Sequence, residues 1–195
     1  MSIDPIAGVA AGVVSLVDGL PYIRDTWRRG TRPHRGTWLI WSMLSIVAFA
    51  SQVAEGGAWS LVMVGTQMLF TSAIFVLSIR RGEGGLSRQD LAILAVAMLG
   101  VAGWLASSDP LVATVCVVAA DSLGVAMMLP KTWRVPESET LVTFVLAAIA
   151  GALSAVAVDG APLDLLLYPL YFAGINGFIA AVIWTRRRAV PLEAG

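Results

Sequence analysis

Charged side chains are scarce in this chain, since Asp, Glu, Lys and Arg make up only 13% of its 195 residues and 57% are hydrophobic. A soluble domain has about 25% charged and about 45–50% apolar residues. The formal net charge is zero, which gives no indication of a nucleic-acid or acidic partner. The composition therefore predicts an integral membrane protein that is surrounded by the lipid bilayer and binds no nucleic acid.

Cysteine, histidine and lysine each occur once. Cys116, between two valines, can form no internal disulfide or cysteine-based metal cluster, and we expect a small packing residue there. His34 lies in a basic segment, and no Ser-His-Asp set, HExxH helix or nucleotide-binding loop accompanies it. Lys131 lies outside the predicted helix cores, which excludes a retinal protein with a Schiff-base lysine in its last helix. We expect no enzyme, no metal and no cofactor.

Seven apolar segments approach the roughly 20 residues that a helix needs to cross a bilayer core of about 30 Å. The start, MSIDPIAGVAAG, has no basic region, so we expect the first segment to be retained as a helix instead of being cleaved as a signal peptide. The predicted helices are Pro5–Arg24, Thr37–Ala54, Ala58–Ile79, Asp90–Ala106, Pro110–Leu129, Thr140–Val158 and Leu163–Trp184.

Basic residues lie on one side of this pattern. With the N-terminus outside, the positive-inside rule places the connections after the first, third and fifth helices and the C-terminal tail inside. These segments hold all 13 Lys and Arg residues: Arg24, Arg28, Arg29, Arg32, Arg35, Arg80, Arg81, Arg88, Lys131, Arg134, Arg186, Arg187 and Arg188. The preference for Arg over Lys is typical of a GC-rich bacterial genome. We therefore expect a multi-pass protein of the bacterial inner membrane with its C-terminus inside.

An internal repeat relates the first two predicted helices to the fifth and sixth at a constant offset of 103 residues. Asp18 falls on Asp121 without any gap in the alignment. Further identical pairs are Leu20 and Leu123, Pro33 and Pro136, Thr37 and Thr140, Ser51 and Ser154, and Gly57 and Gly160. Matches of Asp, Pro, Thr and Gly at one offset indicate a repeat better than matches of Val and Ala.

The repeat predicts an architecture. Three helices end on the side opposite to their start, so a fourth helix must return the chain before the second repeat begins. We expect an all-α membrane protein with a first three-helix repeat in residues 1–83, a linker helix in 84–107, and a second repeat with the basic tail in 108–195. Parallel repeats of this kind bind substrate at the repeat interface.

This three-plus-one-plus-three layout resembles the SWEET and PQ-loop transporter superfamily. The best local match is LPYIRDTWRRG at Leu20–Gly30, where a proline near the inner end of the first helix precedes a basic segment. Leu129–Arg134, LPKTWR, is similar. The resemblance implies alternating access between two three-helix bundles, with sugars, amino acids or other small solutes as substrates.

The chain differs from sugar-carrying members in two ways. Tyr22 follows Pro21 and Lys131 follows Pro130, so there is no Pro-Gln dipeptide, and the predicted second and sixth helices hold no proline. Vitamin-precursor carriers with this fold also lack that dipeptide. We expect a transporter of a small polar solute, with a sugar as first candidate. The alternatives are a carrier of a vitamin precursor, nucleoside or amino acid, and a non-transporting receptor or partner subunit. Each is compatible with a homo-oligomer.

Asp18 and Asp121 are the outstanding polar pair within the predicted helices. Ionisable groups inside a bilayer cost about 2.5–3.5 kcal/mol on insertion scales and usually face the protein interior. Their equivalent positions predict proton coupling or an inner gate, and helix packing with a nearby arginine is the alternative. Pro21, and Gly124 opposite it in the alignment, would weaken the helices at this level.

Five uncharged side chains are the predicted substrate contacts: Asn176, Gln67, Trp41, Thr71 and Tyr171. The resemblance implies an asparagine in the third helix of each repeat, a place that Asn176 and Gln67 would take. Thr71 follows Gln67 by one turn, and an amide both donates and accepts hydrogen bonds. Trp41 could face a cavity, as could Tyr171. For each of them, packing within or between helices is the alternative.

Overall fold

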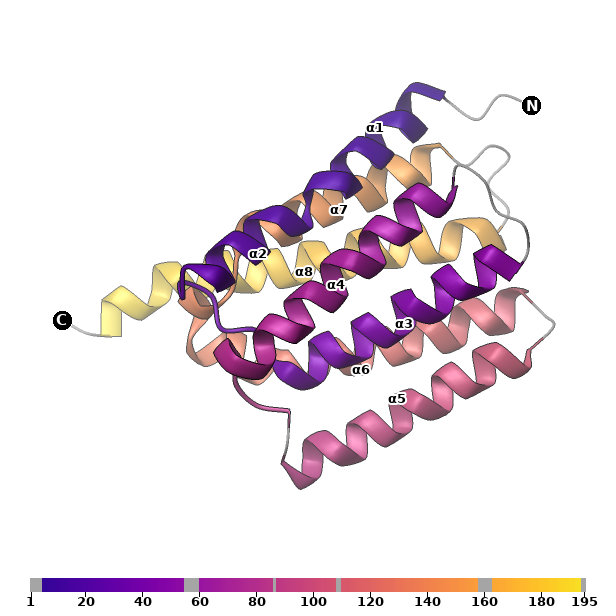
Figure 1. Cartoon of the computed structure of the whole chain (residues 1–195). Coiled ribbons are helices and arrows are strands. Elements are labelled where there is room, and N and C mark those ends of the chain that lie inside the picture. Colours follow the sequence, from indigo (N-terminus) through magenta and orange to yellow (C-terminus); the bar gives the residue numbers. More distant parts are fainter. Residues whose placement is uncertain (1–4, 55–59, 86, 108–109, 158–162, 194–195) are drawn as a thin grey trace. The chain divides into compact units, whose positions relative to one another are not determined.

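The computed structural model describes residues 5–54, 60–85, 87–107, 110–157 and 163–193 (Figure 1). These residues form α1 (Pro5–Val17), α2 (Gly19–Trp27), α3 (Arg35–Ala54), α4 (Ser60–Arg81), α5 (Arg88–Ala106), α6 (Pro110–Arg134), the 3-10 helix η1 (Pro136–Ser138), α7 (Leu141–Val156) and α8 (Leu163–Glu193). Within these ranges no strand is present beyond one isolated bridge. In its described residues each of the seven predicted segments forms a helix, which confirms the all-α class. Ala58 and Val158, at two of the predicted bounds, lie outside the described residues.

The first predicted helix is interrupted at Asp18, between α1 and α2. Pro21 has no N–H to donate to the carbonyl of Val17, four residues earlier, and its ring crowds that carbonyl. The interruption is slight, because Asp18 keeps helical angles of φ −62° and ψ −33°. Its amide also donates to the carbonyl of Val14 at 3.0 Å. The two pieces therefore form one apolar stretch, Ile6–Trp27.

Four helices end later than predicted, at Trp27, Arg81, Arg134 and Glu193, and the difference is largest for the last two. α6 continues through Pro130 to Arg134, and α8 continues to Glu193. Lys131 and Arg134 therefore lie in the last turn of a helix, and Arg186 to Arg188 also lie in a helix, so their assignment to a loop and a tail was wrong. The physical reason is that the predicted ends followed the loss of apolar residues, whereas Lys and Arg are good helix formers and favour helix C-termini.

In the described part of the chain, three helices are long and apolar enough to cross a membrane: Ile6–Trp27, Thr114–Arg134 and Leu166–Ala189. Arg35–Ala50 and Leu141–Val156 are shorter apolar helices. The sequence prediction of spanning helices is thus confirmed in part. Seven crossings with the N-terminus outside stay a prediction.

The chain divides into two compact units, and the first consists of Met1–Thr31 and Leu129–Gly195. In this unit α7 packs against α1, α2 and α8 (Figure 1). Phe144, Ile179 and Ile183 are fully buried in its core. A Cβ at Gly151 would lie 2.6 Å from the backbone nitrogen of Ala173, so α7 and α8 approach closely there.

The second unit, Arg32–Met128, holds α3, α4, α5 and most of α6. In this unit α3 packs against α4 and α5. Its buried core consists of Ile40, Leu44, Ala97, Val101, Ala120 and Met127. Cys116 lies half-buried on α6, where a Cβ at Gly103 of α5 would lie 3.1 Å from its sulfur. A small side chain at 116 therefore suits this contact, as expected for a packing residue.

These units do not follow the division expected from the repeat. The first unit combines the first helix of the N-terminal repeat with the last two helices of the C-terminal repeat, and the second unit takes the remaining helices. Compactness and internal similarity are different properties of a chain. The division into residues 1–83, 84–107 and 108–195 therefore stays a prediction about the repeat.

Candidate functional site

Both aspartates of the predicted pair are buried in apolar helices. Asp18, at the junction of α1 and α2, is 4% exposed, and Asp121, in the middle of α6, is 9% exposed. Asp18 belongs to the first unit and Asp121 to the second. Their shared role as a gate or in proton coupling therefore stays a prediction, because each unit holds one member of the pair.

Gly124 lies where α6 approaches the start of α3. The hydroxyl of Thr37 donates to the carbonyl of Gly124 at 2.6 Å. A Cβ at Gly124 would lie 3.1 Å from Nε1 of Trp41. The structure thus gives Gly124 a role in close helix packing, whereas weakening of α6 at this residue stays a prediction.

Trp41 packs in this same contact. Its ring meets that of Trp38 edge to face, with the centroids 4.9 Å apart. Its Nε1 is buried and has no hydrogen-bond partner in the part of the chain that the structure describes. The indole therefore packs between α3 and α6, and its contact with a solute stays a prediction.

Hydroxyl groups join α3 to α4. Ser45 Oγ lies 2.6 Å from Thr71 Oγ1, and Ser42 Oγ lies 3.0 Å from Ser72 Oγ. Thr71 also donates to the carbonyl of Gln67 at 2.9 Å, and the Gln67 side chain is half-buried. Ser45 also donates to the carbonyl of Trp41 in its own helix at 2.9 Å. The sequence analysis missed the cross-helix pair, although serines at i and i+3 share one helix face.

Asn176 and Tyr171 lie in α8, in the first unit. Asn176 is 7% exposed, and its amide donates to the carbonyl of Phe172 at 2.9 Å, one turn earlier in the same helix. The ring of Tyr171 lies 6.5 Å from that of Tyr168. Asn176 thus has a partner within its own helix, which is the packing alternative, and substrate contact stays a prediction for both residues.

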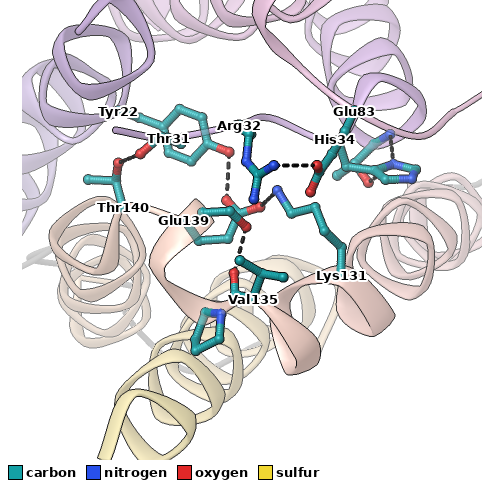
Figure 2. A network of polar contacts seen from close by, with 12 residues as sticks. Tyr22, Thr31, Arg32, His34, Glu83, Lys131, Val135, Glu139 and Thr140 are labelled. Atoms are coloured by element: carbon teal, nitrogen blue, oxygen red, sulfur yellow. Dashed lines mark hydrogen bonds and ion pairs between the residues drawn. The ribbon is translucent and has the colours of Figure 1, made fainter. Parts of the chain in front are cut away.

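A buried acid that the sequence reasoning missed lies between η1 and α7 (Figure 2). The side chain of Glu139 is 0% exposed. The hydroxyl of Tyr22, on α2, donates to Glu139 Oε2 at 2.6 Å. Lys131, in the last turn of α6, forms an ion pair with Oε1. From α8, the guanidinium of Arg187 donates to the backbone carbonyl of Glu139 at 2.6 Å.

This cluster joins four elements of the first unit around one carboxylate. A buried ion pair needs good geometry and further hydrogen bonds to offset its desolvation, and removing one partner leaves an uncompensated charge. Glu139 has both a paired cation and a hydroxyl donor. Because Lys131 is engaged with Glu139, its amine is not a free nucleophile.

A second polar group lies at the same end of α7. The hydroxyls of Thr31 and Thr140 are 2.7 Å apart (Figure 2). Thr140, at the N-cap position of α7, also donates to Asp25 Oδ2 at 3.2 Å. Asp25 uses its other oxygen to accept from Arg24 Nε at 3.0 Å. The segment after α2 is therefore fixed to the start of α7 by side chains.

The basic end of α8 is fixed to the region around η1. Arg187 Nε lies 3.3 Å from Glu137 Oε2. The guanidinium of Arg186 lies 4.7 Å from the ring centroid of Trp133, and that of Arg188 lies 3.8 Å from the ring of Trp184. Such cation–π contacts contribute about 0.5–1 kcal/mol at exposed sites. Arginines predicted as topology signals thus also have packing roles.

In the second unit, two loops pair through their backbones. The amide of Arg35 donates to the carbonyl of Glu83, and the amide of Glu83 donates to that of Pro33, both at 3.0 Å. Arg32 and Glu83 add an ion pair of 3.3 Å (Figure 2). His34 is buried there, with Nδ1 3.2 Å from the hydroxyl of Thr37. The histidine is thus part of the loop packing.

The predicted contact residues are divided between the two units. Gln67, Thr71, Trp41 and Gly124 belong to the second unit, where Ser45 contacts both Thr71 and the carbonyl of Trp41. Asn176, Tyr171, Asp18 and Pro21 belong to the first. Among the described residues, no group of three or more His, Cys, Asp and Glu side chains could hold a metal ion. Comparison with family models, curated proteins and solved structures finds no match.

Proposed function

We propose that this chain is a multi-pass inner-membrane transporter that moves a small polar solute, with a sugar as the first candidate, by alternating access. One observation carries the proposal. Each of the three helices that are long and apolar enough to span a membrane holds one buried polar residue near its middle: Asp18, Asp121 and Asn176. Polar groups inside a membrane are costly, and they commonly mark pathways for substrates or protons.

The residues have distinct roles in this proposal. Asn176, Gln67, Thr71, Trp41 and Tyr171 contact the solute through amide, hydroxyl and indole groups. These groups are uncharged and donate or accept hydrogen bonds, as a neutral polar solute requires. Asp18 and Asp121 act in proton coupling or gating, and Pro21 and Gly124 weaken the helices beside them.

The first experiment is a thermal-shift screen of the purified protein with sugars, amino acids, nucleosides and vitamins. A ligand that binds only the folded state raises the melting temperature by mass action. Any class that stabilises the protein is then tested for uptake into liposomes. Uptake at the level of empty vesicles for the whole panel contradicts the proposal.

Asp18→Asn tests the coupling role. We expect this variant to keep its fold and to lose the pH dependence of uptake, because the amide cannot exchange a proton in this range. Glu137→Gln is the matched control, since the Glu137 side chain is 71% exposed. An unchanged pH profile in Asp18→Asn contradicts proton coupling through this residue.

A non-transporting receptor or partner subunit is the second candidate, and a specific observation favours it. The hydroxyls of Ser45 and Thr71 bond to each other, and the amide of Asn176 bonds within α8, without any ligand. Such groups serve equally well to hold helices together. A panel in which no solute raises the melting temperature, together with copurification of a defined protein partner, supports this candidate.

A further inference from the structure

A shallow groove runs along the surface of the first unit, between α2 and α7. Its walls are mostly apolar, but one end is basic. The lining residues are Val17, Leu20, Pro21, Ile23, Arg24, Trp27, Arg28 and Leu146. None of these lining residues belongs to the Glu139 cluster or to the predicted solute contacts. Pro21 is the one lining residue that the sequence analysis placed beside the predicted gate.

The groove is oriented along the proposed membrane normal. Val17 and Arg28 are separated by 11 positions, which corresponds to about 16 Å of helix axis. The apolar stretch Ile6–Trp27 contains Val17 and ends one residue before Arg28, at Trp27, whose side chain is largely exposed. Tryptophan is enriched at the level of lipid headgroups. The groove therefore extends from the hydrocarbon core to the headgroup region, with its basic end at the headgroups.

Two exposed arginines form this basic end. The Arg24 side chain is 62% exposed, and only its Nε is engaged with Asp25. Arg28 is exposed and has no ion-pair partner among the described residues. A guanidinium carries five N–H donors and binds phosphate oxygens in a bidentate manner. Asp25, the acid beside Arg24, is also engaged by the hydroxyl of Thr140.

We propose that this groove binds one anionic glycerophospholipid, with its phosphate at Arg24 and Arg28 and one acyl chain along Leu20, Ile23 and Leu146. The amphipathic form of such a lipid matches the groove, which is apolar for most of its length and positive at one end. The inference rests on the proposed membrane placement and not on transport. Its test can therefore fail while the transport proposal stands, and the reverse also holds.

The test is lipid binding to the full-length protein in detergent, measured by native mass spectrometry and by thermal shift. The probes are phosphatidylglycerol and phosphatidylcholine with the same acyl chains. We expect phosphatidylglycerol to bind more tightly. The double variant Arg24→Gln/Arg28→Gln should bind it about tenfold more weakly or worse, because each arginine near a lipid surface contributes to the attraction.

Two matched variants separate this site from general surface charge. Arg80→Gln/Arg88→Gln removes the same charge from two exposed arginines outside the groove and should leave the affinity unchanged. Leu20→Trp fills the groove but keeps both arginines, and it should weaken binding, whereas Val9→Trp on exposed α1 surface should not. Gel filtration of each variant checks its fold.

Three outcomes overturn the proposal. They are an equal loss of affinity in the two arginine pairs, full affinity in Leu20→Trp, and equal binding of both lipids. Soluble glycerol 3-phosphate distinguishes a lipid from a free phosphate ester. We expect it neither to stabilise the protein nor to displace the lipid, and stabilisation by this ester alone contradicts an acyl chain in the groove.

Discussion

The starts of α3 and α7 are equivalent in the sequence repeat, but different interactions hold them in their units. Gly36, before Thr37, has no space for a side chain: a Cβ there would collide with the Met127 side chain and lie 3.3 Å from the Cα of Gly85. The equivalent residue before Thr140 is Glu139, a buried carboxylate with a lysine and a tyrosine as partners. The start of α3 is held by close backbone approach, and the start of α7 is held by charge.

This difference shows what the repeat keeps and what it does not. A proline and a threonine recur at both starts, and both threonine hydroxyls bond to a helix of the other sequence repeat. The residue directly before each threonine, Gly36 or Glu139, differs completely in volume and charge. Repeats can therefore share a backbone plan while unrelated interactions stabilise their equivalent helix starts.

The largest expected effect comes from Glu139→Ala. This change leaves the Lys131 ammonium buried without its partner and removes the acceptor for Tyr22, so we expect a loss of about 3–5 kcal/mol of unfolding free energy. Denaturant or thermal unfolding in detergent measures it. The matched control is Lys131→Met/Glu139→Leu, which removes both charges and should recover most of the stability. An equal loss of unfolding free energy in the single and double variants contradicts stabilisation of this helix start by charge.

Tyr22→Phe should have the next largest effect. It removes the hydroxyl that donates to Glu139 and keeps the ring, which packs edge to face on Phe144 at 6.2 Å. Hydrogen bonds to charged groups are worth about 1.5–3 kcal/mol, and we expect a loss in this range. The same unfolding measurement applies. A loss below about 0.5 kcal/mol would mean that Lys131 alone satisfies the carboxylate.

Gly36→Ala tests the close packing at the start of α3. The added methyl group must displace the Met127 side chain or the backbone at Gly85, and overpacking of this kind costs about 1–3 kcal/mol. The control is Gly174→Ala in α8, where no atom lies within 4 Å of the added Cβ. Gly174→Ala should be neutral or stabilising, by up to about 1 kcal/mol, because alanine is the better helix former. Equal effects at both glycines contradict the close approach at Gly36.

The smallest effects are expected at the paired threonines. Thr37→Val removes the hydrogen bond to the carbonyl of Gly124 and the contact with His34 Nδ1, neither of which involves a carboxylate, and it should cost about 0.5–1.5 kcal/mol. Thr140→Val removes contacts to Thr31 and to the Asp25 carboxylate, and it should cost more, up to about 2 kcal/mol after screening at this half-exposed acid. Unfolding of both variants in parallel measures the difference. The reverse order would mean that the first unit does not depend on this side-chain contact.

The helices could be predicted from the sequence because each one follows from a local property. A run of apolar residues of membrane length leaves the backbone no alternative to internal hydrogen bonds. Pro21 also indicates the interruption at Asp18. Its ring crowds the carbonyl of Val17, four residues earlier, so the helix is interrupted directly after Val17.

The Glu139 cluster could not be predicted in this way. Tyr22 and Glu139 are separated by 117 positions, and no periodicity relates them. Glu139 lies among charged and polar residues after α6, so it resembles a loop residue exposed to solvent. The signal that could have found it is its alignment with Gly36, a buried position in the other repeat.

The hydroxyl contacts between α3 and α4 show an intermediate case. Ser42 and Ser45 share a helix face with the spacing that predicts a polar stripe. The stripe alone does not show which helix it meets, because any of several apolar helices could pack there. The sequence therefore predicts Thr71 as a polar contact residue but does not identify its partner Ser45.

The bond between Tyr22 and Glu139 also constrains how the protein is made. A ribosome adds about 5–20 residues per second, so the 117 positions between these residues correspond to roughly 6–23 s of synthesis. On the proposed membrane placement, α1 and α2 enter the bilayer during that interval without the helices on which they pack. The N-terminal helix must wait in the lipid or beside the insertion machinery, and the first unit can assemble only when the C-terminal helices have arrived.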